Sequence, residues 1–214
     1  DEAAFRKNQH RYLGLRAYAD DLVAIADALA LEGAVAVGHS MGGMISLLAA
    51  IDRPARFSRL VLVGASPRYL DDEGYRGGLD KPGLDEVYRL MQSDQASWAE
   101  SFARHVMGNP DRQDLARQLA TRLGALPPAH ALTTLCAIFQ SDVRAELPRV
   151  DQPVLVVHTR DDAAVPLEVA QYLHRHLRRS HLAIIEASGH LPHVSAPEEV
   201  ILAMRQFLDT PVIR

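Results

Sequence analysis

Apolar side chains recur along the chain with a spacing that is typical of helices. Residues 12–31 carry large apolar side chains at alternating steps of three and four, which predicts a helix with one apolar face. These side chains are Leu15, Tyr18, Leu22, Ile25 and Leu29. Gly33 follows this pattern and is a suitable stop for the helix. Residues 1–11 are polar and show no clear period.

Four short apolar runs predict the strands of a sheet. They are residues 34–37, 59–67, 153–159 and 181–187. The first run, Ala-Val-Ala-Val, has no polar alternation, which indicates a parallel strand covered on both faces. Helical patterns follow: an almost entirely apolar one after Ser40, one opened by Pro166, and one from a capping box at Ser195 and Glu198 to Leu208. This alternation predicts an α/β fold, a parallel sheet with flanking helices.

A long segment without a strand pattern separates the second predicted strand from the third. It contains helical patterns at residues 84–91, 97–107, 114–123 and 129–139, separated by Gly, Pro and Asn. A loop of this length inside a compact sheet is uncommon. We therefore predict a helical cap over residues 67–150, inserted into a core formed by residues 1–66 and 151–214.

Composition narrows the class of protein. The 214 residues are 48% hydrophobic and 23% charged with a net charge of −4, which is typical of a globular protein and gives no reason to expect nucleic acid or an anionic membrane. The longest apolar runs, near residues 43–51 and 153–158, are too short to span a bilayer. Cys136 is the single cysteine, which excludes an internal disulfide and favours a cytoplasmic location.

The segment Gly38-His39-Ser40-Met41-Gly42 joins a predicted strand to a predicted helix. A serine hydroxyl becomes a nucleophile only with a base, a group that orients the base, and donors for the oxyanion. A tight turn lifts the serine out of the sheet, and its crowding is expected to require Gly38 and Gly42. The amide of Met41 would face the oxyanion. The alternative is that Ser40 only caps the helix.

Partners for the serine follow the third and fourth predicted strands. Asp162 and His190 come in the order nucleophile, acid, histidine, and lie at the carboxyl edge of the sheet with Ser40. Asp161 and His193 are the competing residues. We predict Asp162 as the acid from its spacing to the following proline, and His190 as the base because it follows a glycine directly after the strand.

Histidines are also frequent near the end of the chain. They are His174, His176, His181, His190 and His193. Their spacing does not bring them to one point, so we expect no metal site and no cofactor. The basic run 174–181 is favourable at a helix C-terminus, and we interpret it as a solvated helix end.

Five segments together resemble the α/β-hydrolase superfamily. They are GHSMGG, RLVLVGASPRYLDDEGYRGG, SWAESFARHVMG, HTRDDAAVP and GHLPHVSAP. They are most similar to the group that holds the RsbQ-type bacterial stress-response hydrolase and the plant strigolactone and karrikin receptors. The similarity covers essentially the whole chain.

The resemblance implies a role for each matching residue. Ser40, Asp162 and His190 match the catalytic triad, and Met41 matches the oxyanion residue. Positions that line a pocket under a four-helix cap are matched by Tyr69, Leu70, Trp98, Phe102, Ile138 and Phe139. The aromatic members could equally pack helix against helix.

The resemblance also implies an activity. Members of this group hydrolyse small esters or lactones, or use such ligands to signal to a protein partner. After Ser40 this chain has Met-Gly-Gly-Met where the receptors carry a Val-Ser-Ala-Met type sequence, which favours an enzyme. We therefore predict a serine hydrolase of a small ester or lactone, with a ligand-sensing receptor that has a signalling partner as the alternative.

One part of the family pattern has no match in this sequence. The family fold has further strands before the helix of residues 12–31, and one of their loops gives a second oxyanion donor. We expect these N-terminal strands to be absent from this chain, either because it is a fragment or because its N-terminal part was lost. We also expect the strand at residues 34–37 to expose an apolar edge.

Overall fold

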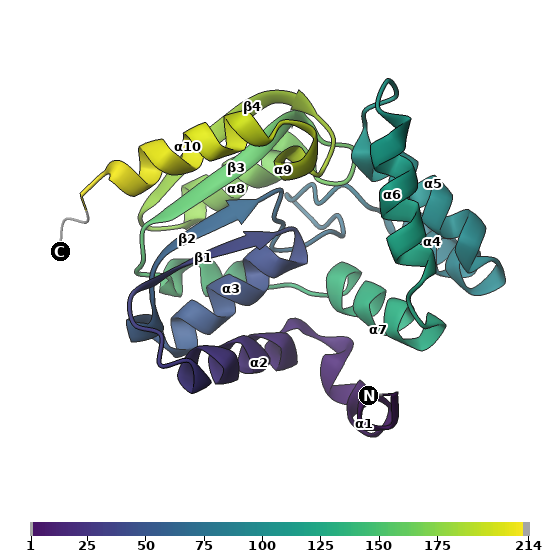
Figure 1. The fold of residues 1–214 in the computed structure, drawn as a ribbon, viewed down its shortest axis with the longest axis horizontal. Helices are drawn as coiled ribbons and strands as arrows, with labels where there is room; N and C mark the ends of the chain where they lie inside the picture. The colour runs from purple at the N-terminus through teal and green to yellow at the C-terminus, as the bar shows by residue number, and fades with distance from the viewer. Residues whose placement is uncertain (1, 212–214) are drawn as a thin grey trace.

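The computed structural model describes residues 2–211 and contains one parallel sheet (Figure 1). Its strands, in the order in which they are hydrogen-bonded, are β1 (Ala34–His39), β2 (Phe57–Val63), β3 (Val154–Asp161) and β4 (Ser180–Ser188). In the parallel register Val37 pairs with Val61, Val61 with Leu155, and Leu155 with His181. The four predicted strands and the α/β class are confirmed.

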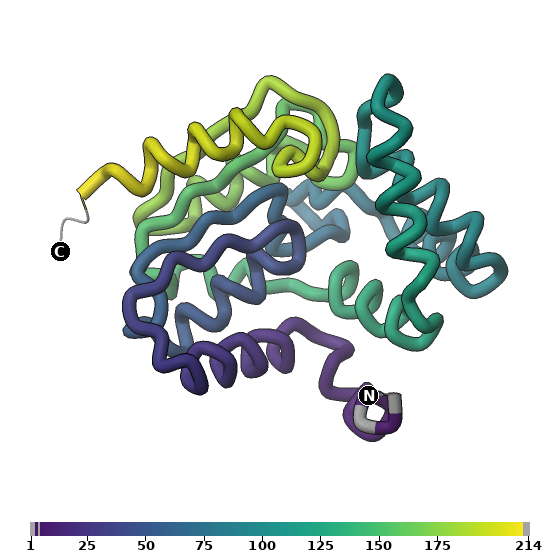
Figure 2. Tube along the Cα trace, in the orientation of Figure 1, coloured from purple at the N-terminus to yellow at the C-terminus, as the bar shows by residue number. Residues whose placement is uncertain are grey.

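Helices cover the two faces of the sheet (Figures 1 and 2). On one side lie α2 (Leu15–Ala28), α3 (Met41–Asp52) and α8 (Leu167–His176), and on the other lies α10 (Pro197–Asp209). Alternate residues of β2 and β3 enter the two cores, because successive side chains of a strand point to opposite faces. Leu60, Leu62, Val154 and Val156 pack with α3 and α8, whereas Val61, Val63, Leu155 and Val157 pack with α10.

Strand β1 differs from the prediction that both of its faces are covered. Ala34 and Ala36 pack against the core on the α3 side, but Val35 is 40% and Val37 53% exposed. The reason is position: within the described residues β1 pairs only with β2, and α10 lies over β3 and β4. The expected apolar edge is present.

The prediction of a helix over residues 12–31 was wrong in detail. The helix expected over residues 12–31 covers only 15–28 and follows a 3-10 helix, Gln9–Leu13. Of its predicted apolar face, Ile25 within the helix and Leu29 just beyond its end are exposed. The polar start of the chain forms α1 (Glu2–Asn8).

The expected capping box does not form. Ser195 ends a short helix, α9 (Pro192–Ser195), and its hydroxyl donates to the carbonyl oxygen of Leu191. Proline at position 197 starts α10 because it needs no acceptor for an N–H there. The last helix is therefore capped without a side-chain hydrogen bond.

Four helices lie between β2 and β3 along the chain, as predicted. They are α4 (Lys81–Ser93), α5 (Gln95–Met107), α6 (Gln113–Gly124) and α7 (Pro128–Phe139), and they sit beyond the carboxyl ends of the strands (Figure 1). We call them the cap. Asp80 and Asp94 cap the first two of these helices by accepting from the amides of Gly83 and Ser97. Among residues 2–211, no helix is long and apolar enough to cross a membrane.

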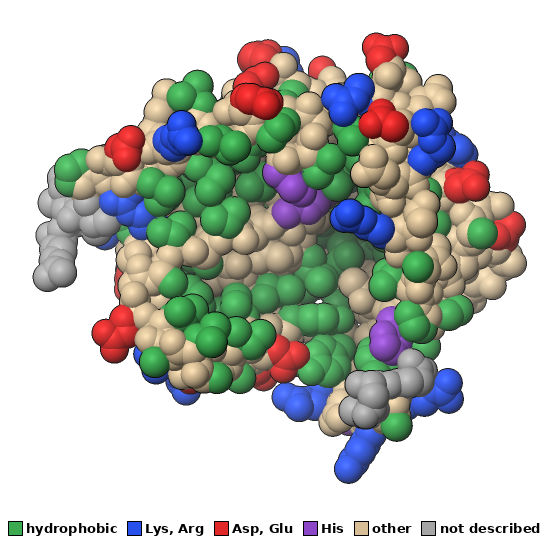
Figure 3. Space-filling view, viewed as in Figure 1, with side chains coloured by type: hydrophobic (Ala, Val, Ile, Leu, Met, Phe, Trp, Pro, Cys, Tyr) green, Lys and Arg blue, Asp and Glu red, His purple; other side chains and the backbone are tan. Residues whose placement is uncertain are grey.

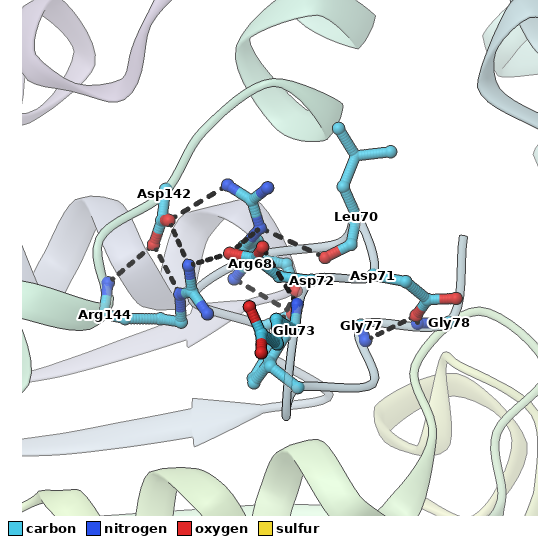
Figure 4. A network of polar contacts seen from close by, with 11 residues as sticks. Arg68, Leu70, Asp71, Asp72, Glu73, Gly77, Gly78, Asp142 and Arg144 are labelled. Carbon is cyan, nitrogen blue, oxygen red and sulfur yellow. Dashed lines mark hydrogen bonds and ion pairs between the residues drawn. The ribbon is translucent and has the colours of Figure 1, made fainter. Parts of the chain in front are cut away.

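An ionic network joins the two segments that connect the cap to the core (Figure 4). Arg68, in the outgoing segment, donates to Asp142 in the returning segment at 3.0 Å. Arg144 donates to both Asp142 and Asp72 at 2.7 Å, and its guanidinium lies over the ring of Tyr75. These contacts hold the two segments together at the base of the cap, next to Tyr69.

Candidate active site

Ser40 occupies a strained turn between β1 and α3. Its φ of 54° and ψ of −123° are unusual for a residue with a Cβ, and such strain accumulates at functional sites. A Cβ on Gly38 would lie 2.3 Å from the carbonyl oxygen of Gly42, so glycine is required there. The matching expectation for Gly42 was wrong, because a Cβ there would meet nothing within 4 Å. It is Gly43 that is crowded, at 2.7 Å from Cβ of Ala65.

Three side chains from separate loops form a hydrogen-bonded chain. Nε2 of His190 lies 2.9 Å from the hydroxyl oxygen of Ser40, and Nδ1 of His190 lies 2.8 Å from Oδ2 of Asp162. The side chains of His190 and Asp162 are 7% and 1% exposed. This is the geometry in which an imidazole can take a proton from a hydroxyl while a carboxylate fixes its tautomer.

The two competing residues lie elsewhere. Asp161 is exposed, and its backbone carbonyl accepts from the amide of Gly189 at 2.7 Å. His193 is exposed on α9, where its ring centroid lies 4.5 Å from that of His39. The structure therefore brings Asp162 and His190, and not their neighbours, to Ser40.

Further contacts fix the backbone of His190. Its amide donates to the carbonyl oxygen of Val106, at the end of cap helix α5, at 2.7 Å. Its carbonyl oxygen accepts from Nε2 of His39 at 2.8 Å. Because the two ring nitrogens are bonded to Ser40 and Asp162, all four polar groups of His190 have partners.

Two donors lie next to Ser40. Met41 is the first residue of α3, so its amide has no acceptor within the helix and is available to an anion. The hydroxyl of Tyr69 lies 3.0 Å from the Ser40 oxygen. Burial raises the pKa of Tyr69, so the phenol stays protonated and can donate.

Comparison with known proteins agrees with this geometry. A family model described as alpha/beta hydrolase fold matches residues 4–197. The chain belongs to this family. A rice protein (Oryza sativa subsp. japonica) that is named a probable esterase is 40% identical to this hydrolase over 192 residues, which are 89% of this chain and 71% of the relative.

Two further relatives extend the comparison. "Karrikin insensitive 2 receptor CA" from Petunia hybrida is 38% identical over 192 residues, 89% of this chain and 71% of its own. The solved structure of a hydrolase from Oleispira antarctica superposes with a TM-score of 0.90 at 28% identity, covering 94% of this chain and 74% of that one. Sequence and fold thus indicate the same family.

The predicted pocket residues gather in one apolar cluster of the hydrolase. Tyr69, Trp98 and Phe139 are buried in it, and Leu70, Phe102 and Ile138 pack against it partly buried. The rings of Trp98 and Phe102 stack at 5.3 Å, and Tyr69 meets Phe139 edge-on at 5.7 Å. Figure 3 shows a hollow between core and cap, with hydrophobic side chains on its floor and histidines at its rim. Of the six residues, Tyr69 makes the hydrogen bond to Ser40.

Charge states in the site follow from burial and neighbours. Burial alone would raise the pKa of Asp162, but the hydrogen bond and charge of His190 outweigh it and hold that pKa below its ordinary value. Burial and the nearby His190 lower the pKa of His39 to about 3. At neutral pH the hydrolase therefore has an ionised Asp162 and a neutral His39.

Sequence reasoning missed three groups that contact the loops of His190 and Asp162. They are the imidazoles of His39 and His158 and the carbonyl group of Val106. A signal exists for the histidines, because each is a polar residue in or at the end of an apolar strand. Nothing in the sequence indicates that a backbone carbonyl of the cap would reach the loop of His190.

We expect the free energy of unfolding of the hydrolase to fall as the pH is lowered from about 6.5 towards 3. The unfolded chain protonates its histidines near pH 6.5, whereas folded His39 is protonated only near pH 3. Unfolding therefore takes up a proton in this window, and His39 contributes up to about 1.4 kcal/mol per pH unit. Burial lowers the pKa of His158 in the same direction. Asp162 acts at lower pH, because its pKa is depressed and its stabilisation is lost only as the pH falls through that value.

Urea unfolding at pH values between about 7 and about 5 measures this slope. The variant His39→Gln, which has no titratable group at this position, should lower the slope by the contribution of one histidine. A free energy of unfolding that does not change over this range would contradict the burial of neutral histidines in the folded state.

Proposed function

We propose that this hydrolase cleaves a small carboxylic ester or lactone through an acyl-enzyme on Ser40. The hydroxyl oxygen of Ser40 attacks the substrate carbonyl carbon while Nε2 of His190 takes the hydroxyl proton. The oxyanion accepts a hydrogen bond from the Met41 amide, and Asp162 stabilises the imidazolium. His190 then gives its proton to the leaving alkoxide, and a water molecule activated by the same imidazole releases the acid.

The hydrogen-bonded chain from Ser40 through His190 to Asp162 is the observation that carries this proposal. Its distances of 2.9 and 2.8 Å suit proton transfer without any rearrangement of the loops. Burst kinetics with p-nitrophenyl acetate test it: p-nitrophenol should be released in a burst of one equivalent, and intact-mass measurement should find an acetyl group on the protein. Because p-nitrophenyl acetate is an activated ester, acylation should be faster than deacylation and the adduct should accumulate. Turnover without any acetylated protein would then contradict an acyl-enzyme.

The substrate class rests on the apolar cluster beside the triad. The six predicted pocket residues offer one hydroxyl, that of Tyr69, and one indole N–H, that of Trp98, among otherwise apolar surfaces. Such a lining selects apolar ligands with few polar groups. The name of the rice relative as a probable esterase supports the same class.

A ligand-sensing role is the second candidate, and the relative named a karrikin insensitive receptor favours it. In that case a small ester or lactone would be bound and slowly cleaved, and the occupied state would recruit a signalling protein. Turnover separates the two roles: an enzyme should release many equivalents of product, whereas a sensor should stop near one. Pull-down with and without a candidate lactone would then detect the partner.

We expect the variant Tyr69→Phe to lower kcat about two- to tenfold, because a hydrogen bond between neutral groups contributes about 0.5–1.5 kcal/mol. The Ser40 hydroxyl gives its one proton to His190, so the phenol is the donor in its contact with the Ser40 oxygen. It can donate to the adjacent oxyanion once Ser40 has attacked. Tyr88→Phe is the matched control, since the Tyr88 hydroxyl bonds to the side chain of Gln140 instead. Steady-state kinetics of both variants on one ester measure the effect, and equal values of kcat would exclude this role.

A further inference from the structure

Two histidines outside the triad contact the loops that carry its base and its acid. His39, the last residue of β1, donates from Nε2 to the carbonyl oxygen of His190 at 2.8 Å. His158, in β3, donates from Nε2 to the carbonyl oxygen of Val165 at 3.0 Å. A carbonyl oxygen only accepts, so in both imidazoles Nε2 carries the proton.

The two receiving carbonyls lie in the segments that present the catalytic groups. His190 follows the end of β4 and precedes α9, outside both elements. Val165 ends the turn 162–165, in which Oδ1 of Asp162 accepts from the amides of Ala164 and Val165 at 2.8 and 3.0 Å. Neither segment has a regular ladder of backbone hydrogen bonds, so single side-chain contacts can decide its position.

The burial of His158 carries a cost in stability that its hydrogen bond to Val165 offsets. The side chain is 0% exposed, and its Nδ1 has no hydrogen-bond partner within residues 2–211. A buried acceptor without a partner lowers stability, whereas an apolar side chain of similar size would avoid this loss. The imidazole supplies a hydrogen-bond donor to Val165, which an apolar residue could not do.

His39 lies against the ring of the base. The centroids of the His39 and His190 rings are 4.9 Å apart, and those of the His39 and His193 rings are 4.5 Å apart. A charged group here would oppose the imidazolium that forms on His190 during the reaction. A neutral imidazole can hold the loop without this penalty.

We infer that His39 and His158 are positioning residues. His39 holds the backbone of the loop that carries the base, His190, and His158 holds the backbone of the loop that carries the acid, Asp162. In these positions His190 reaches Ser40 and Asp162 reaches His190. This inference rests on the proposed triad chemistry. Displacement of a catalytic group by a fraction of an ångström lowers the rate of the chemical step while leaving substrate binding largely intact. The effect of losing either donor should therefore appear in kcat and not in KM.

Substitution of each histidine by glutamine and by asparagine tests the Nε2 donor apart from the rest of the imidazole. In glutamine Nε2 is as many bonds from Cα as Nε2 of histidine, whereas the asparagine amide reaches only as far as Nδ1. We expect His39→Gln and His158→Gln to keep kcat within about threefold, and His39→Asn and His158→Asn to lose about tenfold with KM nearly unchanged. Labelling of Ser40 by a fluorophosphonate should slow in the same order. His176→Asn, on the exposed end of α8, is the control.

The outcomes are distinguishable from failure of the proposed function. If Ser40→Ala retains wild-type turnover, the triad chemistry itself fails. If turnover depends on Ser40, equal kcat in the folded Asn and Gln variants would overturn the positioning role. Should an Asn variant not fold, the corresponding Leu variant replaces it; loss of folding in both would show a bond needed for the fold and would also overturn the proposal.

Discussion

The variant Ser40→Ala should lose at least about four orders of magnitude in the turnover of p-nitrophenyl acetate, because the nucleophile of the proposed acyl-enzyme is removed. The loss should appear in kcat, since the apolar cluster that we propose to bind the ester is untouched. Alanine also removes the hydrogen bonds to His190 and Tyr69, but it keeps the Cβ and the backbone of the turn.

Ser46→Ala is the matched control for this variant. Ser46 lies in α3, the helix that follows Ser40, and its hydroxyl donates to the carbonyl oxygen of Gly42 rather than to a group of the triad. Its kcat should stay within about threefold of the wild-type value. If both variants hydrolysed the ester at the wild-type rate, Ser40 would not be the nucleophile.

The variant Asp162→Asn should lower kcat by about 10³- to 10⁴-fold while the fold is preserved. An asparagine amide can donate to Nδ1 of His190, which favours the tautomer with the proton on Nε2, and that tautomer cannot accept the proton of Ser40. The asparagine oxygen can still accept from the amides of Ala164 and Val165, so the turn should keep its shape.

Asp161→Asn provides the comparison, because it makes the same chemical change one residue away on an exposed side chain. Its kcat should be close to that of the unchanged protein. A loss at position 161 that matched or exceeded the loss at position 162 would show that the acid had been assigned to the wrong residue. Circular dichroism and thermal unfolding of both variants establish that each is folded.

The order of strands and helices was predictable because this fold repeats one simple unit. Residues 60–63 of β2 and 154–157 of β3 are unbroken apolar runs, since both of their faces are covered. The cap helices have the spacing of helices packed on one side. The exposure of Val37 was not predictable from its own residues, because an apolar run looks the same in the middle of a sheet and at its edge. Whether a strand lies at the edge depends on which other strands pair with it, and its own residues do not encode that.

The residues of the candidate triad were predictable for a different reason. Parallel strands bring their carboxyl ends to one edge, so residues that directly follow them meet even when the sequence separates them by more than a hundred positions. The choice of His190 over His193 needed only the glycine before it. The order of strands does not predict contacts between the cap and the core, such as the hydrogen bond from the amide of His190 to the carbonyl oxygen of Val106.

Crowding at the serine turn shows how a local expectation can fail at one residue. The pattern around Ser40 suggested that both flanking glycines were needed for space. In the structure only Gly38 is crowded by the turn, whereas Gly43 is required by its close approach to Ala65, which lies just after the end of β2. That second requirement depends on how α3 packs on the sheet, which the short pattern does not contain.

Mapping the site of covalent labelling tests the central claim most directly. The protein would be treated with a fluorophosphonate, digested, and analysed by peptide mass spectrometry. The hydrogen-bonded chain predicts a single adduct on Ser40, formed much more slowly in Asp162→Asn. An adduct on another serine, or an unlabelled Ser40 in protein that hydrolyses esters at its full rate, would contradict it.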